Sequence, residues 1–395
     1  MKNIIDKINN FIKSHTNLVV FLLAFPHIYH ITFPNGSIPI IEFSISRLRL
    51  LSCLLIFLLF LINKKKTSKL LIASFAYSFV ILISTFINYR DNLNHSILFV
   101  SSFLGLSLLI EYFKDNLIQI ISPILLCFEL QIYPNLITVA LFRNTLSEYS
   151  YNINKFLLGT ANDMILYLLP ALFLSILYIK LTKHKLGPII TIIIVSLTIL
   201  LSDSFTTMVS LLMFIIVFIY CAVIKKNNIK YTYLIFLIPL IIYAIVVLPY
   251  LISGSNAIMQ YVFDNIYYNH SFECRAFIWT DAKKYILDRP ILGYGYYNDS
   301  IVMIGNENDI YSLAHNTFIQ VILNYGFIGL IVFISYLFIP IAKVIKQKNS
   351  FYKTLFISTI CSILITFVTQ DYHRFFEFQI IFNIIYLFED NADLN

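Results

Sequence analysis

The chain has 395 residues, of which 59% are hydrophobic and only 12% are charged, and its formal net charge is +7. Soluble domains carry about 25% charged residues, so this composition excludes a soluble globular protein and indicates a polytopic membrane protein. The positive charge does not indicate nucleic-acid binding, because the lysines lie in short clusters between apolar runs, where they orient membrane spans.

The apolar runs predict the elements in chain order. Residues 4–12 repeat apolar side chains at helical spacing opposite Lys2, Asp6 and Asn9, which predicts a short helix on the membrane surface. A transmembrane helix needs about 20 apolar residues, and about twelve runs qualify. The expected spans are 17–33, 41–62, 69–88, 96–112, 117–142, 156–179, 186–202, 205–224, 231–250, 317–342, 354–370 and 376–388. We therefore expect an all-α, polytopic membrane helix bundle that forms one transmembrane domain over residues 1–395.

The basic residues predict the orientation of this bundle. With both termini in the cytoplasm, most lysines lie on the cytoplasmic side, as the positive-inside rule requires. Every arginine falls instead in an outer loop or at the outer end of a span: Arg47, Arg49, Arg90, Arg143, Arg275, Arg289 and Arg374. Arg47 and Arg49 fit a role at lipid head groups, whereas the set favours recognition of a phosphate or diphosphate, because guanidinium binds such anions with two parallel hydrogen bonds.

Residues 251–316 form the longest expected loop, on the outer face. Loops of this length tend to be functional. Arg275 and Trp279 are four residues apart, so they share one face of a predicted helix on which the indole can hold the guanidinium stem. A proline and two glycines then end this helix and allow a turn: Pro290, Gly293 and Gly295.

The last residues of this loop, His315 and Asn316, come directly before the span that begins near Thr317. Histidine has an ordinary pKa of about 6.5, which suits a general base acting on a hydroxyl group near neutral pH. A single histidine at this position is also typical of an interfacial side chain that hydrogen bonds the backbone. The order of the motifs within one loop favours an active site in residues 251–316.

Together these motifs resemble the O-antigen ligase and polymerase family of bacterial inner-membrane proteins. The resemblance is carried by Arg275 with Trp279, Pro290, Gly293, Gly295, His315-Asn316, Gly326 with Gly329, and the segment Gly159-Thr-Ala-Asn162. It implies a twelve-helix bundle similar to the lipid-linked glycosyltransferases. It also implies transfer of a glycan from undecaprenyl diphosphate to an acceptor hydroxyl at the outer face of the cytoplasmic membrane, without a cofactor or metal ion.

The resemblance also implies roles for individual residues and partners. By position, His315 matches the proposed base and Arg275 matches an arginine that binds the diphosphate. Four further residues fall in supporting positions: Trp279, Asn316, Gly293 and Gly295. The implied partners are an undecaprenyl diphosphate-linked glycan and membrane lipid, with a chain-length regulator protein as a further candidate.

The chain departs from the family pattern before the span 205–224. The family commonly has a serine–arginine pair there, whereas this sequence reads Ser202-Asp-Ser-Phe205, so the second diphosphate-binding arginine is missing. We expect another outer arginine to supply its charge, with Arg374 in the short turn between the last two spans as the first candidate and Arg143 as the second. A shifted alignment and an inactive protein are the alternatives.

The sequence leaves three functions open. Polymerisation of repeat units into O-antigen or capsular polysaccharide is preferred, because weak motif retention is what we expect of polymerases. An O-antigen ligase, which transfers glycan to lipid A core, uses the same donor. A lipid-linked sugar flippase or transporter is suggested by Glu129, which lies between Pro123 and Pro134 in an expected broken helix. A metal-dependent transferase is disfavoured, because residues 34–47 offer only Glu42 as a carboxylate.

Overall fold

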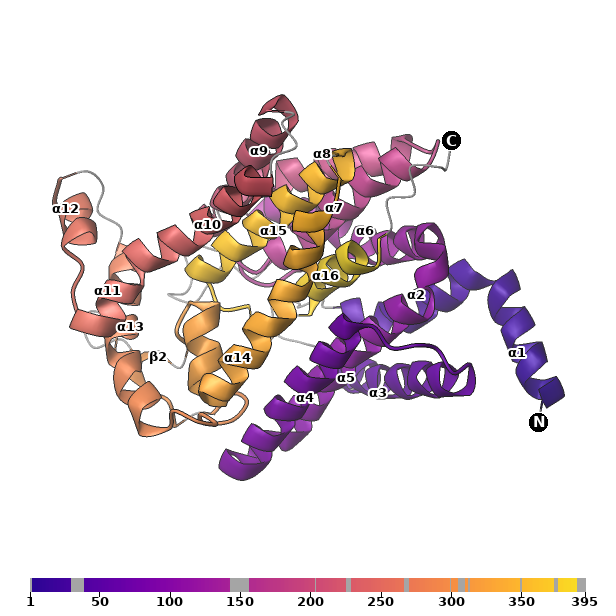
Figure 1. Cartoon of the computed structure of the whole chain (residues 1–395), viewed down its shortest axis with the longest axis horizontal. Coiled ribbons are helices and arrows are strands. Elements are labelled where there is room, and N and C mark those ends of the chain that lie inside the picture. The colour runs from indigo at the N-terminus through magenta and orange to yellow at the C-terminus, as the bar shows by residue number, and fades with distance from the viewer. Residues whose placement is uncertain are drawn as a thin grey trace. The chain divides into compact units, whose positions relative to one another are not determined.

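The computed structural model describes residues 2–29, 39–142, 156–202, 204–224, 229–265, 270–298, 300–304, 310–311, 313–348, 350–372 and 376–388. These residues are almost entirely helical (Figure 1). The α-helices are α1 (Lys2–Ser14), α2 (Thr16–Ile28), α3 (Pro39–Ile62), α4 (Lys69–Asn88), α5 (Leu93–Tyr112), α6 (Leu117–Phe142), α7 (Ile165–Leu181), α8 (Leu186–Leu201), α9 (Phe205–Ile224), α10 (Ile229–Val246), α11 (Leu248–Ser253), α12 (Ala257–Asn265), α13 (His270–Asp288), α14 (Thr317–Lys346), α15 (Phe351–Thr369) and α16 (Glu377–Leu387). Two short 3₁₀ helices, η1 (Arg90–Asn92) and η2 (Lys114–Asn116), precede α5 and α6, and β1 (Met303–Ile304) pairs antiparallel with β2 (Ile310–Tyr311).

Within the described residues, eight helical segments are long and apolar enough to cross a membrane. They are Ile40–Ile62, Lys69–Asn88, Arg90–Tyr112, Lys114–Leu141, Phe205–Val223, Thr232–Ser253, Thr317–Lys346 and Phe351–Thr369. Four shorter apolar helices, α2, α7, α8 and α16, overlap the remaining expected spans. The all-α membrane class is confirmed, and the protein is a multi-pass membrane protein. The count of twelve spans and the inward orientation of both termini stay predictions.

Two expectations about helices are wrong. The span expected over 156–179 begins as a helix only at Ile165, because residues 156–164 fold into a turn in which Phe156 and Gly159 exchange backbone hydrogen bonds of 2.8 and 2.9 Å. The helix expected to break near Glu129 is instead continuous, since α6 runs from Leu117 to Phe142 through both of its prolines. Prolines are tolerated within membrane helices that neighbouring helices support, and α6 packs against α2, α7 and α8.

The described residues form two compact units. Unit 1 lies within Met1–Ser74, Ser101–Leu212 and Phe376–Asn395, and unit 2 lies within Phe75–Val100 and Met213–Phe375. In unit 1, α6 packs against α2, α7 and α8, and α16 packs against α7. In unit 2, α14 packs against α10, α13 and α15. Arg275, Trp279 and His315 all belong to unit 2, so this unit carries the main candidate site.

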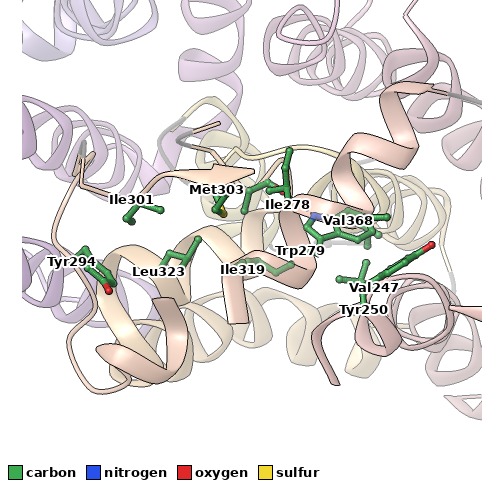
Figure 2. Packing of buried hydrophobic residues seen from close by; sticks show 13 residues of the cluster. Val247, Tyr250, Ile278, Trp279, Tyr294, Ile301, Met303, Ile319, Leu323 and Val368 are labelled. Atoms are coloured by element: carbon green, nitrogen blue, oxygen red, sulfur yellow. Dashed lines mark hydrogen bonds between the residues drawn. The ribbon is translucent and has the colours of Figure 1, made fainter. Parts of the chain in front are cut away.

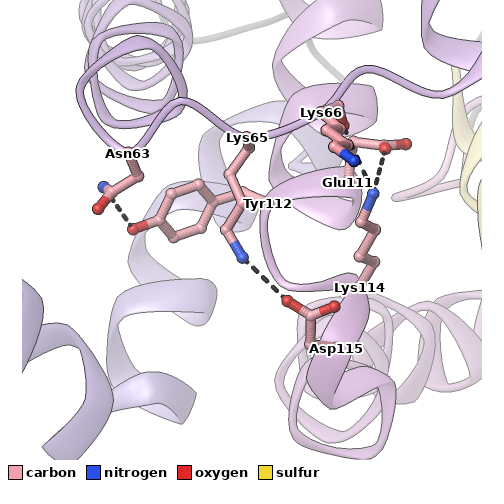
Figure 3. Close-up of polar contacts among 7 residues, drawn as sticks. All are labelled: Asn63, Lys65, Lys66, Glu111, Tyr112, Lys114 and Asp115. Atoms are coloured by element: carbon pink, nitrogen blue, oxygen red, sulfur yellow. Dashed lines mark hydrogen bonds and ion pairs between the residues drawn. The ribbon is translucent and has the colours of Figure 1, made fainter.

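A cluster of lysines and carboxylates in unit 1 joins two connections between helices (Figure 3). Lys65 Nζ lies 2.9 Å from the carboxylate of Asp115, and Lys114 Nζ lies 3.1 Å from Oε1 of Glu111. The side chain of Glu111 is only 1% exposed and sits in the last turn of α5. A carboxylate at a helix C-terminus is unfavourable, so Glu111 depends on Lys114 for its compensating charge. These lysines are among those predicted to face the cytoplasm.

The predicted N-terminal surface helix is present as α1. Asn9, on its polar face, donates a hydrogen bond of 3.0 Å to the side-chain oxygen of Asn63 at the end of α3. This contact joins α1 to α3 within unit 1. Its position on a membrane surface stays a prediction.

Candidate functional site

The segment 251–316, which was expected to be a long loop, contains the end of α11, the helices α12 and α13, and a strand pair in its described residues. The predicted helix that carries both Arg275 and Trp279 is α13, which ends at Asp288. Proline disfavours helical geometry in the residue before it, and Pro290 follows the helix by two positions. The long helix α13 therefore gives Arg275 and Trp279 a rigid support.

The glycines after Pro290 bring this turn directly against the backbone of α14. Tyr294 N donates to Leu323 O and Gly295 N donates to Asn324 O, both at 2.8 Å, and Phe327 N donates to Pro290 O at 2.7 Å. These carbonyls are available because α14 is interrupted at Gly326, whose φ is +64°. The turn thus completes the backbone hydrogen bonding of a broken helix.

Side chains would prevent this approach. A Cβ atom at Gly293 would lie 2.5 Å from Leu323 O, and one at Gly326 would collide with Ile291 O. Gly293, Gly295 and Gly326 also have positive φ angles of 64°, 90° and 64°, which glycine adopts without strain. The motif residues Gly293 and Gly295 therefore shape the backbone around the site.

A serine on α4 also bonds to the turn after Pro290 and to α14. Ser84 Oγ contacts the carbonyl oxygens of Leu292 at 2.5 Å and Asn324 at 2.9 Å. The side chain of Asn324 accepts a hydrogen bond of 3.0 Å from Gln320, one turn earlier in α14. This polar chain continues toward His315, because Gln320 Oε1 accepts a hydrogen bond of 2.7 Å from Ala314 N.

Trp279 lies in the hydrophobic core of unit 2 (Figure 2). Its indole is fully buried beside Ile278, Val368 and Tyr250, with its ring centroid 6.0 Å from that of Tyr250. The indole Nε1 donates a hydrogen bond of 2.8 Å to Ala314 O. Trp279, which was predicted to support the site, thus anchors the backbone immediately before His315.

Asn316 fixes the backbone immediately after His315. It is the N-cap of α14, because its Oδ1 accepts a hydrogen bond of 3.0 Å from Ile319 N. Its Nδ2 donates to Val368 O on α15, also at 3.0 Å. Asn316 is fully buried, so it joins α14 to α15 instead of facing a ligand.

His315 itself has a left-handed backbone with a φ of +46°. Histidine is one of the residue types that occupy this region most often, yet such a conformation persists only where the surrounding structure enforces it. The bonds made by Ala314 and Asn316 provide that constraint. The side chain of His315 is half-buried, and its Nδ1 lies 3.0 Å from Oε1 of Gln370.

The segment Gln370–Tyr372 follows α15 and is tied to α14 by Thr317. Thr317 Oγ1 donates to Gln370 O and accepts from Tyr372 N, both at 2.9 Å. Gln370 in this segment contacts His315. His315 is also linked to the helix of Arg275, because Trp279, one turn after Arg275 on α13, donates to Ala314 O. The structure therefore brings the neighbourhoods of Arg275 and His315 together, although 40 residues separate them in the sequence.

Arg275 is a partly buried cation. Burial lowers the pKa of Arg275 below its ordinary value, whereas nearby Tyr372 and Cys274 act in the opposite direction. A guanidinium nevertheless stays protonated in a protein. Among the described residues, no ion pair or hydrogen bond engages the Arg275 side chain. A desolvated cation of this kind is suited to bind an anion.

Four further outer arginines bear on the predicted roles. Arg143 and Arg374, the candidates for the second diphosphate ligand, lie outside the described residues. Arg49 does more than reach toward lipid, because its guanidinium donates to Pro26 O at 2.8 Å and to Tyr29 O at 2.9 Å at the end of α2. Arg289 lies 3.7 Å from the carboxylate of the preceding Asp288.

The segment Gly159–Asn162 belongs to unit 1. There Asn162 Oδ1 accepts a hydrogen bond of 2.7 Å from Ser204 Oγ, and Ser204 Oγ in turn accepts from Thr207 N at 3.2 Å. Ser204 thus caps α9 and links its start to the glycine-containing turn. The neighbouring Asp203 lies outside the described residues.

Sequence reasoning missed the polar residues that hold the site: Ser84, Gln320, Asn324 and Gln370. Gln320 and Asn324 did carry a signal, since two amides one turn apart within an apolar span indicate a buried polar contact. Gln370 carried none, because it contacts a histidine 55 residues away. Within the described part of the chain, no three His, Cys, Asp or Glu side chains gather as metal ligands do.

Comparison with known families shows that residues 190–334 match the model of the O-antigen ligase family. This range runs from α8 into α14 and includes Arg275, Trp279 and His315. No curated protein matches the chain.

Proposed function

Because residues 190–334 match the model of the O-antigen ligase family, we propose that the chain is a polysaccharide polymerase of the O-antigen ligase and polymerase family. It joins undecaprenyl diphosphate-linked oligosaccharide repeat units into O-antigen or capsular polysaccharide, at the outer face of the bacterial cytoplasmic membrane. The reaction is a glycosyl transfer that needs no metal ion.

One observation carries the proposal. Trp279, one turn after Arg275 on α13, donates a hydrogen bond to Ala314 O, directly before His315. A general base and an anion-binding cation are the two groups that transfer from a diphosphate donor requires. This link between the helix of Arg275 and the backbone next to His315 supports a single site for both.

In the proposed step, the hydroxyl oxygen of the acceptor sugar forms a bond to the anomeric carbon of the donor glycan. The bond between that carbon and the phosphate oxygen breaks, and its electron pair leaves with undecaprenyl diphosphate. His315 takes the hydroxyl proton. Arg275 stabilises the negative charge that develops on the leaving diphosphate.

The diphosphate carries more negative charge than one guanidinium neutralises, so a second cationic side chain is expected to bind it. Arg374 is the first candidate because it follows the segment Gln370–Tyr372 by two residues, and Arg143 is the second. Donor binding by purified protein tests both. If Arg374→Ala and Arg143→Ala each bind the lipid-linked donor like wild type while Arg275→Ala does not, one arginine suffices.

The glycan pattern of a deletion strain separates the possible functions. We expect a single repeat unit on the lipid A core, since chains cannot then be extended. Bare core would identify the ligase instead, which the description of the matching family favours. An unchanged distribution of glycan chain lengths would exclude both activities.

The structure does not support the transporter alternative, which depended on a broken helix at Glu129. Helix α6 is continuous, and Glu129 accepts a hydrogen bond of 2.5 Å from Thr191.

Metal independence has its own test. We expect that EDTA leaves chain extension by the purified protein unchanged. Loss of activity with EDTA and recovery with magnesium would contradict this part of the proposal.

A further inference from the structure

The hydrogen bond between His315 and Gln370 determines which imidazole nitrogen carries a proton. Gln370 Oε1 is an amide oxygen, which accepts hydrogen bonds and cannot donate them. It lies 3.0 Å from His315 Nδ1, so Nδ1 donates. In a neutral imidazole the other nitrogen, Nε2, then has no proton and can accept one.

The position of Gln370 is itself fixed. It ends α15 with its backbone N–H donating to Thr366 O at 3.0 Å, and its carbonyl accepts the hydrogen bond from Thr317 Oγ1. His315 is constrained equally by its left-handed backbone and by the bonds on either side of it. The contact therefore joins two groups that have little freedom to separate.

We infer that Gln370 is a positioning residue that holds His315 in the tautomer with Nδ1 protonated, so that Nε2 is the atom that receives the acceptor proton. This inference rests on the proposed function for the role of Nε2, but the tautomer can be measured without it.

The first test is spectroscopic. Protein with ¹⁵N-labelled histidine, reconstituted in lipid nanodiscs, reports the tautomer of each neutral imidazole through its nitrogen shifts and ¹⁵N–¹H couplings. His315→Asn identifies the His315 signals, and asparagine tolerates the left-handed backbone. We expect Nδ1 protonated and Nε2 bare in the wild type. A protonated Nε2 in the neutral wild-type ring would overturn the inference, and this measurement needs no variant of Gln370.

The second test changes the hydrogen-bond acceptor. Gln370→Leu removes it, and we expect a mixture of tautomers and a decrease in kcat of about 10- to 100-fold at unchanged KM, as for loss of a residue that orients a histidine. Gln370→Glu keeps an acceptor and should retain the tautomer. The matched control is Gln347→Leu, because Gln347 ends α14 as Gln370 ends α15 and its Oε1 has no hydrogen-bond partner among the described residues.

The outcomes distinguish the inference from the proposed function. An unchanged His315 tautomer in Gln370→Leu would overturn the inference. If the tautomer shifts as expected while His315→Asn still extends chains, Gln370 does position His315, but the proposed catalytic role of His315 is wrong.

Discussion

Arg275 and His315 differ in how firmly the protein holds their side chains. His315 is fixed through its own side chain and through the residues on either side of it. Arg275 lies on the rigid helix α13, but within the described residues no ion pair or hydrogen bond engages its guanidinium. The base is therefore set in place in advance, whereas the cation keeps its hydrogen-bonding capacity for a ligand.

This difference predicts the behaviour of a conservative substitution at Arg275. Lysine keeps the charge but loses the planar pair of donors that matches a diphosphate. We expect Arg275→Lys to lower chain extension nearly as much as Arg275→Ala, with both proteins inserted at normal levels. Recovery of most of the activity by lysine would show that Arg275 acts only as a point charge.

At the scale of elements, the interruption of α14 is the feature on which the site depends. The turn after Pro290 occupies the backbone groups that this interruption leaves available, and Ser84 bonds to both segments. The presence and the ends of α13 could be predicted from its own residues. The break at Gly326 could not, because within the sequence Gly326 is one small residue in an apolar run, and its partner is a turn formed more than 30 residues earlier.

The break predicts that Gly326→Ala destabilises the protein. Alanine would be forced into a positive φ and its Cβ would collide with Ile291 O, together worth more than about 2 kcal/mol. Gly187→Ala is the matched control, since a Cβ there meets nothing within 4 Å. Thermal unfolding of the detergent-purified proteins should show a lower Tm for Gly326→Ala alone. Equal Tm values would mean that the break is not required.

A second prediction concerns the lysine cluster of unit 1. Lys114→Met leaves the buried carboxylate of Glu111 without its cation, which destabilises by up to about 3 kcal/mol, reduced by solvent because Lys114 is 29% exposed. The double variant with Glu111→Gln removes both charges and should regain most of the lost Tm. If the double variant is no more stable than Lys114→Met, the pair does not contribute as proposed.

At the scale of the whole molecule, apolar runs were sufficient to predict the helical membrane class, because spans are set by local composition. Helix α6 shows the limit of that approach: Pro123 and Pro134 suggested a break, but packing against three other helices supports a continuous helix. The candidate base was predicted from the position of His315 before a span. Its partner Gln370 depends on the packing of α14 against α15, which no local pattern encodes.

In the proposed function, His315 removes the proton from the acceptor during chain extension. This role is tested by the rate of extension by purified protein in a lipid bilayer, supplied with undecaprenyl diphosphate-linked repeat units. We expect His315→Ala to reduce this rate by about 10²- to 10⁴-fold with donor binding unchanged, while His184→Ala, at an exposed histidine between α7 and α8, extends chains normally. Extension by His315→Ala at the wild-type rate would show that His315 is not the base.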